Sequence, residues 1–556
     1  MPRVREAGDS TLIVEFGDRV DLDVNARVLA TAARLRAAAW PGVRDVVPTC
    51  RSVAVAFDPL RTGVADITDA IRRYADGPVA VGASRTVEVP VEYGGAAGPD
   101  LEEVAAGSRL SPAEVIARHA SQPYRVFMLG FLPGFAYLGP VDPSIHAPRR
   151  SSPRRRVPPG SVAIAGGQTG IYPQASPGGW QIVGRTTLRP FVASRTPAAL
   201  LLPGDTVRFV PAVPGSLGAF DAVWAEVPSG EAPGEAAGET PSGEPLQARS
   251  PARGLTVLNA GLMTTVQDGG RWGHQHEGVP VSGAMDLEAL RQANAAIGHP
   301  RAAAALEATL SGLELRMDHA GAVAIAGADL GATLDGRPVP LHERTSWDAG
   351  ALLRLTGRVR GARAYIAFDG AIDVAPSLGS RATDMTSGLG GRRLRAGDRL
   401  ALGPPVVGSI RRRPAQVSPV PSGGARVRVL PGPHDEWFSP DALALLQRTR
   451  FELTPESNRM GYRLHGPQPV PRDPREMISD ATCAGGLQVP PSGQPILLMA
   501  DRQVTGGYPI IATVITADLP MAGQLAPGDW IEFELCTRVD AIRALEEQER
   551  AYGAAQ

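Results

Sequence analysis

The chain has 556 residues, enough for roughly three to five domains, and its hydrophobic fraction of 43% is ordinary for a globular protein. The formal net charge of -1 argues against nucleic acid or an anionic membrane as a partner held by bulk charge. The sequence has no lysine, so it cannot supply the lysine of a P-loop, a Schiff base or a biotin attachment site.

No apolar run approaches the roughly 20 residues that span a bilayer, and the N-terminus shows no signal-peptide core. We therefore expect a cytoplasmic protein. Cys50, Cys483 and Cys536 are odd in number and far apart, which indicates neither a disulfide framework nor a CxxC metal site.

Residues 1–85 predict a small α+β domain of ferredoxin-like type. A β-α-β-β-α order favours helices packed on an antiparallel sheet. The hydrophobic periodicity places strands at Thr11–Phe16, Val43–Val47 and Ser52–Phe57, and helices at Asn25–Ala39 and Val64–Tyr74.

Residues 86–228 predict a β-barrel. A strand is expected at Thr86–Val91, and a capping box at Ser111–Glu114, with Pro112 at the first helical position, predicts a helix to about His119. Short strands broken by glycine and proline follow, which is typical of a barrel.

Residues 229–253 are rich in Pro, Gly, Glu and Ser and predict a flexible linker. Strand signals punctuated by glycine and proline resume after it, and we expect two further β-barrel domains, at 254–415 and 416–556. Three helices are expected there, at Asp286–Ile297, Pro440–Arg448 and Arg538–Tyr552.

Two motifs recur along the chain. LLPGDTVRF (Leu201–Phe209) resembles LRAGDRLAL (Leu394–Leu402) and LAPGDWIEF (Leu525–Phe533), and each is a Gly-Asp turn before an alternating strand. TGIYP (Thr169–Pro173) also matches TGGYP (Thr505–Pro509) without a gap. The repeats indicate related barrels on both sides of the linker, so the predicted fold is mainly β with an α+β N-terminal domain.

The stretch GGQTGIYPQASPGGW (Gly166–Trp180) is the first candidate site. Its glycines allow the backbone to approach a ligand closely, and Gln168, Thr169 and Tyr172 offer hydrogen-bonding groups. A barrel corner would use the same glycines to turn the chain. The TGxYP match favours paired sites that face one cleft, although both interpretations stay open.

A second candidate is the arginine-rich segment His146–Arg156, whose guanidinium groups suit carboxylates and phosphates. A solvated loop is the alternative, because charge runs usually lie in solvent. The aromatic loop Phe127–Gly139 either packs in the core or forms the wall of a small-molecule pocket.

The Gly-rich segment Thr264–Asp286 crowds polar side chains before a helix. Its His274 and His276 lack the carboxylate spacing of a metal site, so no metal is expected. No G-x-S-x-G elbow surrounds Ser282, which argues against a serine hydrolase.

In the C-terminal part, Arg459 and Arg463 either bind an acid group or form structural ion pairs.

These motifs carry a family resemblance. GFLPGFAYLG, HAPRR, VPPGSVAIAGGQTGIYP and SPGGWQIVGRT resemble the KipI family, the B subunit of 5-oxoprolinase. TTVQDGGRWGH, GVPVSGAMD, LGSRATD, NRMGYRL, GGLQVPPSGQPILL and VTGGYPIIATV resemble the KipA family, the C subunit of 5-oxoprolinase. The pair is also similar to the carboxyltransferase region of urea amidolyase.

The resemblance implies tandem cyclophilin-like β-barrels. It also implies ATP-dependent opening of 5-oxoproline to glutamate, with Mg²⁺-ATP as cosubstrate and a separate third 5-oxoprolinase subunit, of the LamB/YcsF type. Two alternatives accompany it: biotin-dependent carboxyl transfer to urea, with biotin carried on another protein, and inhibition of a histidine kinase. Fold alone does not choose among these functions.

We predict a site in a cleft between barrels, in a protein that needs the LamB/YcsF-type subunit for activity and binds neither nucleic acid nor membrane; a homo-oligomer stays open. The predicted catalytic residues are Gln168, Tyr172, Gln267, Asp268, Gln503 and Tyr508. The predicted substrate- or phosphate-binding residues are His146, Arg149, Arg155, Arg185, Ser282 and Arg459.

Overall fold

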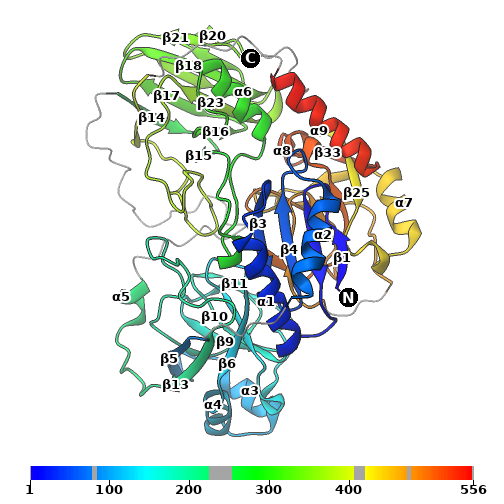
Figure 1. Ribbon diagram of the computed structural model, residues 1–556. Coiled ribbons are helices and arrows are strands. Elements are labelled where there is room, and N and C mark those ends of the chain that lie inside the picture. Colours follow the sequence, from blue (N-terminus) through cyan, green and yellow to red (C-terminus); the bar gives the residue numbers. More distant parts are fainter. Residues whose placement is uncertain (1, 78–83, 225–252, 406–419, 473–476, 554–556) are drawn as a thin grey trace.

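The computed structural model describes residues 2–77, 84–224, 253–405, 420–472 and 477–553. Along the chain it forms an α+β domain, a closed barrel, a pair of sheets and a second closed barrel. The N-terminal domain, blue in Figure 1, lies against the second barrel, so distant parts of the sequence pack together. Of the predicted linker, 229–252 lie outside the described residues.

The N-terminal domain has one antiparallel sheet in the order β1-β2-β4-β3. The predicted elements are present, and an edge strand precedes them. In a ferredoxin-like β-α-β-β-α-β chain the last strand of the sheet follows the second helix. In this domain the additional strand, β1, instead precedes the predicted β-α-β-β-α elements, so the order along the chain differs from that of a ferredoxin-like domain. The elements are β1 (Arg3–Glu6), β2 (Thr11–Glu15), α1 (Leu22–Ala37), β3 (Val43–Pro48), β4 (Ser52–Phe57) and α2 (Val64–Ala75).

The strand after α2 enters the first barrel, whose order is β10-β7-β6-β13-β5-β12-β9. The capping box of Ser111 and Glu114 forms as predicted. The barrel strands are β5 (Thr86–Tyr93), β6 (Tyr124–Leu129), β7 (Ala136–Gly139), β9 (Ser161–Ala165), β10 (Gln168–Ile171), β12 (Gln181–Arg185) and β13 (Thr206–Pro211). Around them lie α3 (Leu101–Ser108), α4 (Pro112–Ala120), η1 (Pro143–Ile145), α5 (Phe220–Trp224) and the β8 (Arg154–Val157)–β11 (Ser176–Gly178) pair.

The predicted barrel at 254–415 is wrong, because the described strands of this segment form a six-stranded and a five-stranded sheet. One apolar core lies between the two sheets. The first sheet has β14 (Gly254–Ala260), β17 (Leu313–Met317), β19 (Ala332–Leu334), β20 (Arg337–Pro338), β22 (Leu352–Leu355) and β24 (Arg399–Ala401). The second has β15 (Met263–Gln267), β16 (Ala305–Thr309), β18 (Gly321–Asp329), β21 (Thr345–Trp347) and β23 (Arg360–Phe368).

Strand β18 explains how this sandwich differs from a barrel. Val323 and Ile325 point into the core between the sheets. The alternate residues Ala322, Ala324 and Ala326 pack under helix α6 (Leu287–Ile297). Both faces of the strand are therefore buried, and small alanines on one face let the helix approach.

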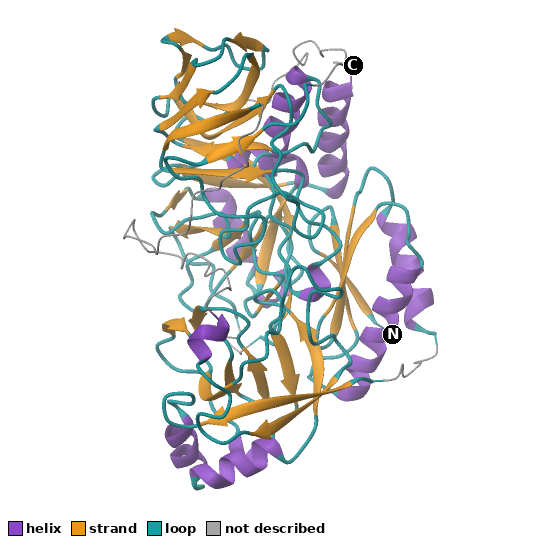
Figure 2. Ribbon diagram, turned by 90° about the vertical axis from the view of Figure 1, so that its left-hand side faces the viewer, coloured by secondary structure: helices purple, strands orange, loops and turns teal. Residues whose placement is uncertain are grey.

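The second barrel has the order β25-β32-β29-β30-β27-β26-β33. Helices lie mostly at the periphery of the molecule (Figure 2). The strands are β25 (Gly424–Pro431), β26 (Phe451–Leu453), β27 (Gly461–His465), β29 (Gly486–Gln488), β30 (Ile496–Leu498), β32 (Ile510–Val514) and β33 (Trp530–Leu535). The remaining elements are η2 (Gln275–Glu277), η3 (Asp435–Trp437), α7 (Pro440–Arg448), β28 (Asp480–Ala481), β31 (Thr505–Gly506), η4 (Thr516–Asp518), α8 (Leu519–Gly523) and α9 (Arg538–Gly553).

The Gly-Asp repeat has the same structural role in both barrels. It leads into β13 and β33, which close their barrels by parallel pairing with β5 and β25. Asp205 and Asp529 each accept a hydrogen bond from the backbone N–H three residues earlier, at 2.9 Å in both copies. The third copy makes the same turn in the sandwich, where Asp398 accepts from the N–H of Arg395 at 2.8 Å. The repeat therefore marks a shared turn, and the parallel pairing of β13 and β33 is what relates the two barrels.

The TGxYP match has a different outcome. Thr169 lies in β10, a barrel strand between β7 and β9, whereas Thr505 lies in β31, outside the barrel, paired with β28. The equivalent of β31 in the first barrel is β11, because each precedes a barrel strand by the same spacing. With this spacing, the structural counterpart of Gly506-Gly507-Tyr508 is Pro177-Gly178-Gly179, so Tyr508 and Tyr172 do not occupy equivalent positions.

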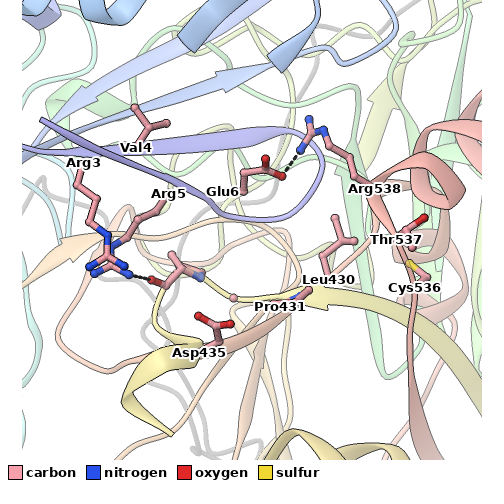
Figure 3. A pocket seen from close by; sticks show the side chains of 12 residues that line it. Arg3, Val4, Arg5, Glu6, Leu430, Pro431, Asp435, Cys536, Thr537 and Arg538 are labelled. Carbon is pink, nitrogen blue, oxygen red and sulfur yellow. Dashed lines mark hydrogen bonds and ion pairs between the residues drawn. The ribbon is translucent and has the colours of Figure 1, made fainter. Parts of the chain in front are cut away.

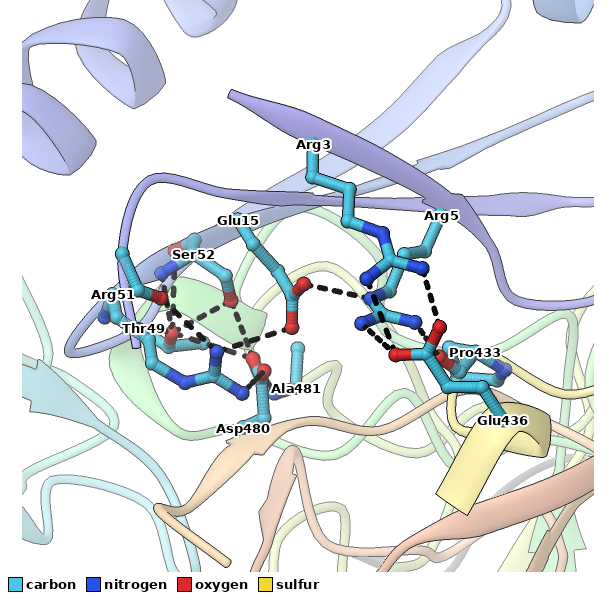
Figure 4. Close-up of polar contacts among 11 residues, drawn as sticks. Arg3, Arg5, Glu15, Thr49, Arg51, Ser52, Pro433, Glu436, Asp480 and Ala481 are labelled. Atoms are coloured by element: carbon cyan, nitrogen blue, oxygen red, sulfur yellow. Dashed lines mark hydrogen bonds and ion pairs between the residues drawn. The ribbon is translucent and has the colours of Figure 1, made fainter. Parts of the chain in front are cut away.

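A buried carboxylate joins the N-terminal domain to the second barrel. Asp480, in β28, accepts hydrogen bonds from the hydroxyls of Thr49 and Ser52, and its carboxylate lies 3.3 Å from the guanidinium of Arg51 (Figure 4).

Among the described residues, no helix is long and apolar enough to cross a bilayer.

Candidate functional site

A cavity of about 660 Å³ lies between the first barrel and the segment that leads into β28 of the second barrel. Its size is within the range of small-molecule pockets. Val20 of the N-terminal domain also lines it, so three units of the fold meet here. The lining residues are Val20, Gln122, Pro140–Pro143, His146, Pro148, Arg149, Ala165–Gln168 and Met477–Ser479. We call this cavity the interbarrel cleft.

The first barrel places three predicted site residues, His146, Arg149 and Gln168, in the interbarrel cleft. The imidazole of His146 contacts the carbonyl oxygen of Val141 through Nε2 at 3.1 Å. Gly166 has a φ of +55°, and a β-carbon there would point into open space. The glycine pair therefore turns the β9–β10 hairpin, as the barrel-corner interpretation predicts, and the backbone at Gly166 stays accessible.

Tyr137 lies in the aromatic loop Phe127–Gly139, for which the sequence left open either the core or a pocket wall. Burial raises the pKa of its phenol, and hydrogen bonding with Thr505 and Ser479, together with the charge of Arg149, partly offsets that rise. The phenol from the first barrel therefore meets hydroxyls of the second barrel beside the cleft. The sequence did not distinguish Tyr137 from the other aromatic residues of this loop, because an aromatic residue in a strand is usually core.

Other predicted residues of the first half lie outside the interbarrel cleft. Tyr172 is buried in an aromatic cluster, with ring contacts to Phe131 and Phe135, and burial raises the pKa of its hydroxyl. Arg185 donates through Nε to the carbonyl oxygen of Pro159 at 2.9 Å. Arg155 is exposed on β8 and does not line the cleft.

The arginine-rich segment is partly neutralised within the protein. Arg150 and Arg154 both pair with the buried carboxylate of Asp100, at 3.1 and 2.6 Å. The same carboxylate accepts the N–H of Ile182 at 2.7 Å. Two arginines of the predicted anion patch therefore hold β8 to the barrel.

In the second barrel, Gln503 and Tyr508 flank β31. The carbonyl oxygen of Gln503 accepts the hydroxyl of Thr482, and Tyr508 is 38% exposed. Between them, Thr505 accepts a hydrogen bond from the backbone N–H of Phe131 at 3.1 Å. The turn therefore contacts the first barrel through Thr505, and the two tyrosines of the TGxYP match do not face one cleft.

Gln267 and Asp268 organise the sandwich domain. Gln267 is fully buried, and its amide donates to Thr265 and to the carbonyl oxygen of Thr383, both at 3.0 Å. Asp268 accepts from the hydroxyl of Ser380 at 2.7 Å and the N–H of Arg381 at 2.6 Å. These contacts tie the Gly-rich segment to residues 380–383.

Arg459 lies at the junction of the sandwich and the second barrel. Its guanidinium pairs with Glu307 and with Asp501, the latter at 2.9 Å, and all three side chains are at least 97% buried. It also donates to the carbonyl oxygen of Gly283, next to Ser282. Arg459 is therefore the centre of an ion-pair network between two domains. Of the two roles considered for it, acid binding and a structural ion pair, the geometry supports the structural ion pair.

A second cavity, of about 420 Å³, lies between β1 and the second barrel. Its arginines are paired: Arg538 contacts Glu6 (Figure 3), and Arg5 contacts Glu15 and Glu436 (Figure 4). We assign it no ligand.

Within the described residues, no group of three or more His, Cys, Asp or Glu side chains is arranged to hold a metal ion.

Comparison with known proteins defines the class. Residues 2–201 match the family described as carboxyltransferase domain, subdomain C and D, and residues 277–535 match carboxyltransferase domain, subdomain A and B. Both parts of a two-part carboxyltransferase-domain architecture are therefore present in this one chain.

The relatives define the family within that class. The chain is 40% identical over 301 residues to the 5-oxoprolinase C subunit of Escherichia coli, covering 54% of this chain and 96% of the relative. It is 42% identical over 220 residues to the 5-oxoprolinase B subunit of Bacillus subtilis, covering 37% and 92%. The crystal structure of TTHA0988 is 36% identical, with a TM-score of 0.81, covering 96% of this chain and 100% of that chain.

This chain belongs to the family of 5-oxoprolinase B and C subunits, with the two fused. Urea amidolyase of Lachancea kluyveri is more distant, at 32% identity over 302 residues that cover 50% of this chain and 16% of the relative. The predicted family and the predicted tandem barrels are confirmed.

Proposed function

We propose that the chain is the B–C component of an ATP-dependent 5-oxoprolinase that opens 5-oxo-L-proline to L-glutamate together with a separate LamB/YcsF-type subunit. The observation that carries this proposal is that the chain covers nearly the whole length of two kinds of 5-oxoprolinase subunit, B and C. The interbarrel cleft is the proposed active site, because both halves line it.

The chemistry requires activation of an unstrained amide. ATP would phosphorylate the lactam oxygen, and water would then add to the activated carbon, break the C–N bond and release glutamate, ADP and phosphate. Within the cleft, Arg149 is the proposed contact for a phosphate or carboxylate oxygen. Gln168 is the proposed amide contact, and His146 lies beside it to exchange a proton.

The absence of lysine makes arginine the cation for this role. Asp142 is the carboxylate that lines the interbarrel cleft, where Mg²⁺ carried by ATP phosphates would find an oxygen ligand. Hydrogen bonds from Ser144 lower the pKa of Asp142, which keeps it ionised for that purpose.

The direct test mixes the purified chain with the LamB/YcsF-type subunit, ATP, Mg²⁺ and 5-oxoproline and measures glutamate. We expect release that requires both proteins and ATP. Bicarbonate-dependent carboxylation of urea, in the presence of a biotinyl carrier and without glutamate release, would instead assign the chain to the urea amidolyase type. Suppression of a histidine kinase without either reaction would leave a binding role.

A further inference from the structure

The turn between β3 and β4 of the N-terminal domain contacts a side chain that lines the interbarrel cleft. In this turn, the sulfur of Cys50 accepts a hydrogen bond from Nε2 of Gln168, 3.7 Å away. Gln168 lines the cleft, whereas Cys50 does not and is 0% exposed. Within the described residues, no other hydrogen bond holds the side-chain amide of Gln168. The contact with Cys50 therefore decides how this amide is held.

Both barrels fix the position of Cys50. The side-chain amide of Asn25, in α1, donates to the carbonyl oxygen of Cys50 at 3.3 Å and to that of Phe127, in the first barrel, at 3.1 Å. Asp480 of the second barrel accepts the hydroxyl of Ser52, at the end of the same turn (Figure 4). The thiol therefore lies on a support that neither barrel forms alone.

The chemistry of Cys50 suits support rather than nucleophilic catalysis. Its side chain packs in an apolar cluster with Met128 and Tyr137. Burial, followed by the charge of Asp480, raises the pKa of the thiol to about 12. Because the nucleophilic form of cysteine is the thiolate, this thiol stays neutral and unreactive at neutral pH, and its sulfur serves as a weak hydrogen-bond acceptor.

We propose that Cys50 is a positioning residue of the interbarrel cleft, whose sulfur holds the amide of Gln168 in the orientation that meets the ligand. The terminal torsion of a glutamine side chain is broad and roughly two-fold, so an amide without such a contact rotates. The inference rests on the proposed function, in which Gln168 is the amide contact. It gives the N-terminal domain a part in the active site that both halves build.

The test compares Cys50→Ala with Cys50→Ser in the full chain, assayed for glutamate release with the LamB/YcsF-type subunit, ATP, Mg²⁺ and 5-oxoproline. We expect Cys50→Ala to lower kcat/KM by about three- to tenfold, the loss of roughly one hydrogen bond. Cys50→Ser keeps an acceptor and should recover most of kcat/KM, although a hydroxyl in an apolar cluster lowers Tm at least as much as alanine does. A purely structural role predicts the reverse, with the less stable variant less active.

A double-mutant cycle shows whether Cys50 acts through Gln168. In a Gln168→Ala background, Cys50→Ala should lower kcat/KM by less than about twofold further, because no amide is left to orient.

Cys483→Ala is the matched control. This thiol is similarly buried, at 2% exposure, and its sulfur lies 3.8 Å from the hydroxyl of Thr513, away from the residues that line the cleft. Its loss should leave kcat/KM as it is in the native chain.

The proposal is overturned if Cys50→Ala is as active as the native chain, if Cys50→Ser recovers nothing, or if the losses from Cys50→Ala and Gln168→Ala multiply. Crystal structures of the native chain and of both Cys50 variants give a readout that needs no reaction. The amide of Gln168 should occupy one conformation in the native chain and in Cys50→Ser, and several in Cys50→Ala. A native chain that releases no glutamate but shows this change would reject the reaction and retain the positioning role; an unchanged Gln168 in Cys50→Ala would reject that role whatever the activity.

Discussion

Arg459 is enclosed by protein on every side, and its charge is balanced by two equally buried carboxylates, Glu307 and Asp501. Removing one partner of a buried ion pair leaves the others without compensation, at a cost of about 3–5 kcal/mol. We therefore predict that Arg459→Met lowers the free energy of unfolding by that amount, measured by urea denaturation.

The matched control is Arg354→Met. Arg354 pairs with Glu314 at 3.2 Å on the sandwich surface, and both side chains are more than one-third exposed. This change should alter stability by less than about 1 kcal/mol. Equal losses of unfolding free energy in the two variants would show that burial does not make the Arg459 ion pairs more stabilising than an exposed pair.

Asp384 gives a prediction for pH. Burial, followed by the charge of Asp501, raises the pKa of its carboxyl to about 6. The folded chain therefore keeps a proton that the unfolded chain loses near pH 4, and stability falls as pH rises from about 4 to about 6.

Asp384→Asn should remove this decline, since the amide oxygen can still accept from the backbone at Thr386 and its nitrogen can donate to Ser387. The difference in unfolding free energy between variant and native chain should grow by up to about 3 kcal/mol between pH 4 and pH 7. A difference in unfolding free energy that stays constant between pH 4 and pH 7, or that changes in the opposite direction, would contradict the raised pKa of Asp384.

Sequence pattern found part of the candidate site. His146, Arg149 and Gln168 stand out as polar residues in glycine- and proline-rich segments, and they line the interbarrel cleft. Ser479 was missed, and Tyr137 was considered only as part of an aromatic loop, because only folding brings the two from different halves to one place. Tyr172 was placed in the site by the TGxYP match, but its large apolar ring gains more by packing with Phe135.

At the scale of elements, a loop contact links the two barrels. Phe131 donates its backbone N–H to Thr505, and a β-carbon on the preceding Gly130 would overlap the Thr505 hydroxyl oxygen. Gly130→Ala must therefore push β31 away from the first barrel. We predict a lower Tm, by several degrees, and reduced glutamate release in the presence of the LamB/YcsF-type subunit.

Gly107→Ala is the comparison for this change. Gly107 lies in helix α3, where an added β-carbon meets nothing within 4 Å, and alanine favours a helix. Its Tm should be unchanged or higher. Unaltered Tm and activity in Gly130→Ala would mean that the contact between the loops does not shape the cleft.

The elements themselves were largely predictable. Helix α7 spans the predicted residues, Pro440–Arg448, because Ser439 caps it and proline stands at its first position. Strand β1 escaped prediction, since Val4 is the single apolar residue of Arg3–Glu6 and the strand lies at the edge of its sheet. Barrel and sandwich were confused at 254–415, because both are built from short alternating strands, and only their pairing separates them.

At the scale of the whole molecule, the N-terminal domain joins the two halves. Asp480 of the second barrel is buried against Ser52 and Arg51 of that domain. We predict that Asp480→Ala loosens this junction and raises hydrogen–deuterium exchange in β4 and β28, at a cost of about 1–3 kcal/mol.

Asp441→Ala, on the exposed first turn of α7, is the control and should leave the exchange of both strands as it is. Exchange in Asp480→Ala that matches the native chain would mean that other contacts suffice to hold the domain.

The central claim is that the two fused halves build one active site between their barrels. Glutamate release with the LamB/YcsF-type subunit, ATP and 5-oxoproline tests it most directly when one variant is taken from each half, Arg149→Met and Ser479→Ala. The account predicts that each lowers release by about tenfold or more at unchanged Tm, whereas Ser346→Ala on the exposed sandwich surface does not. Full activity in both cleft variants would contradict it.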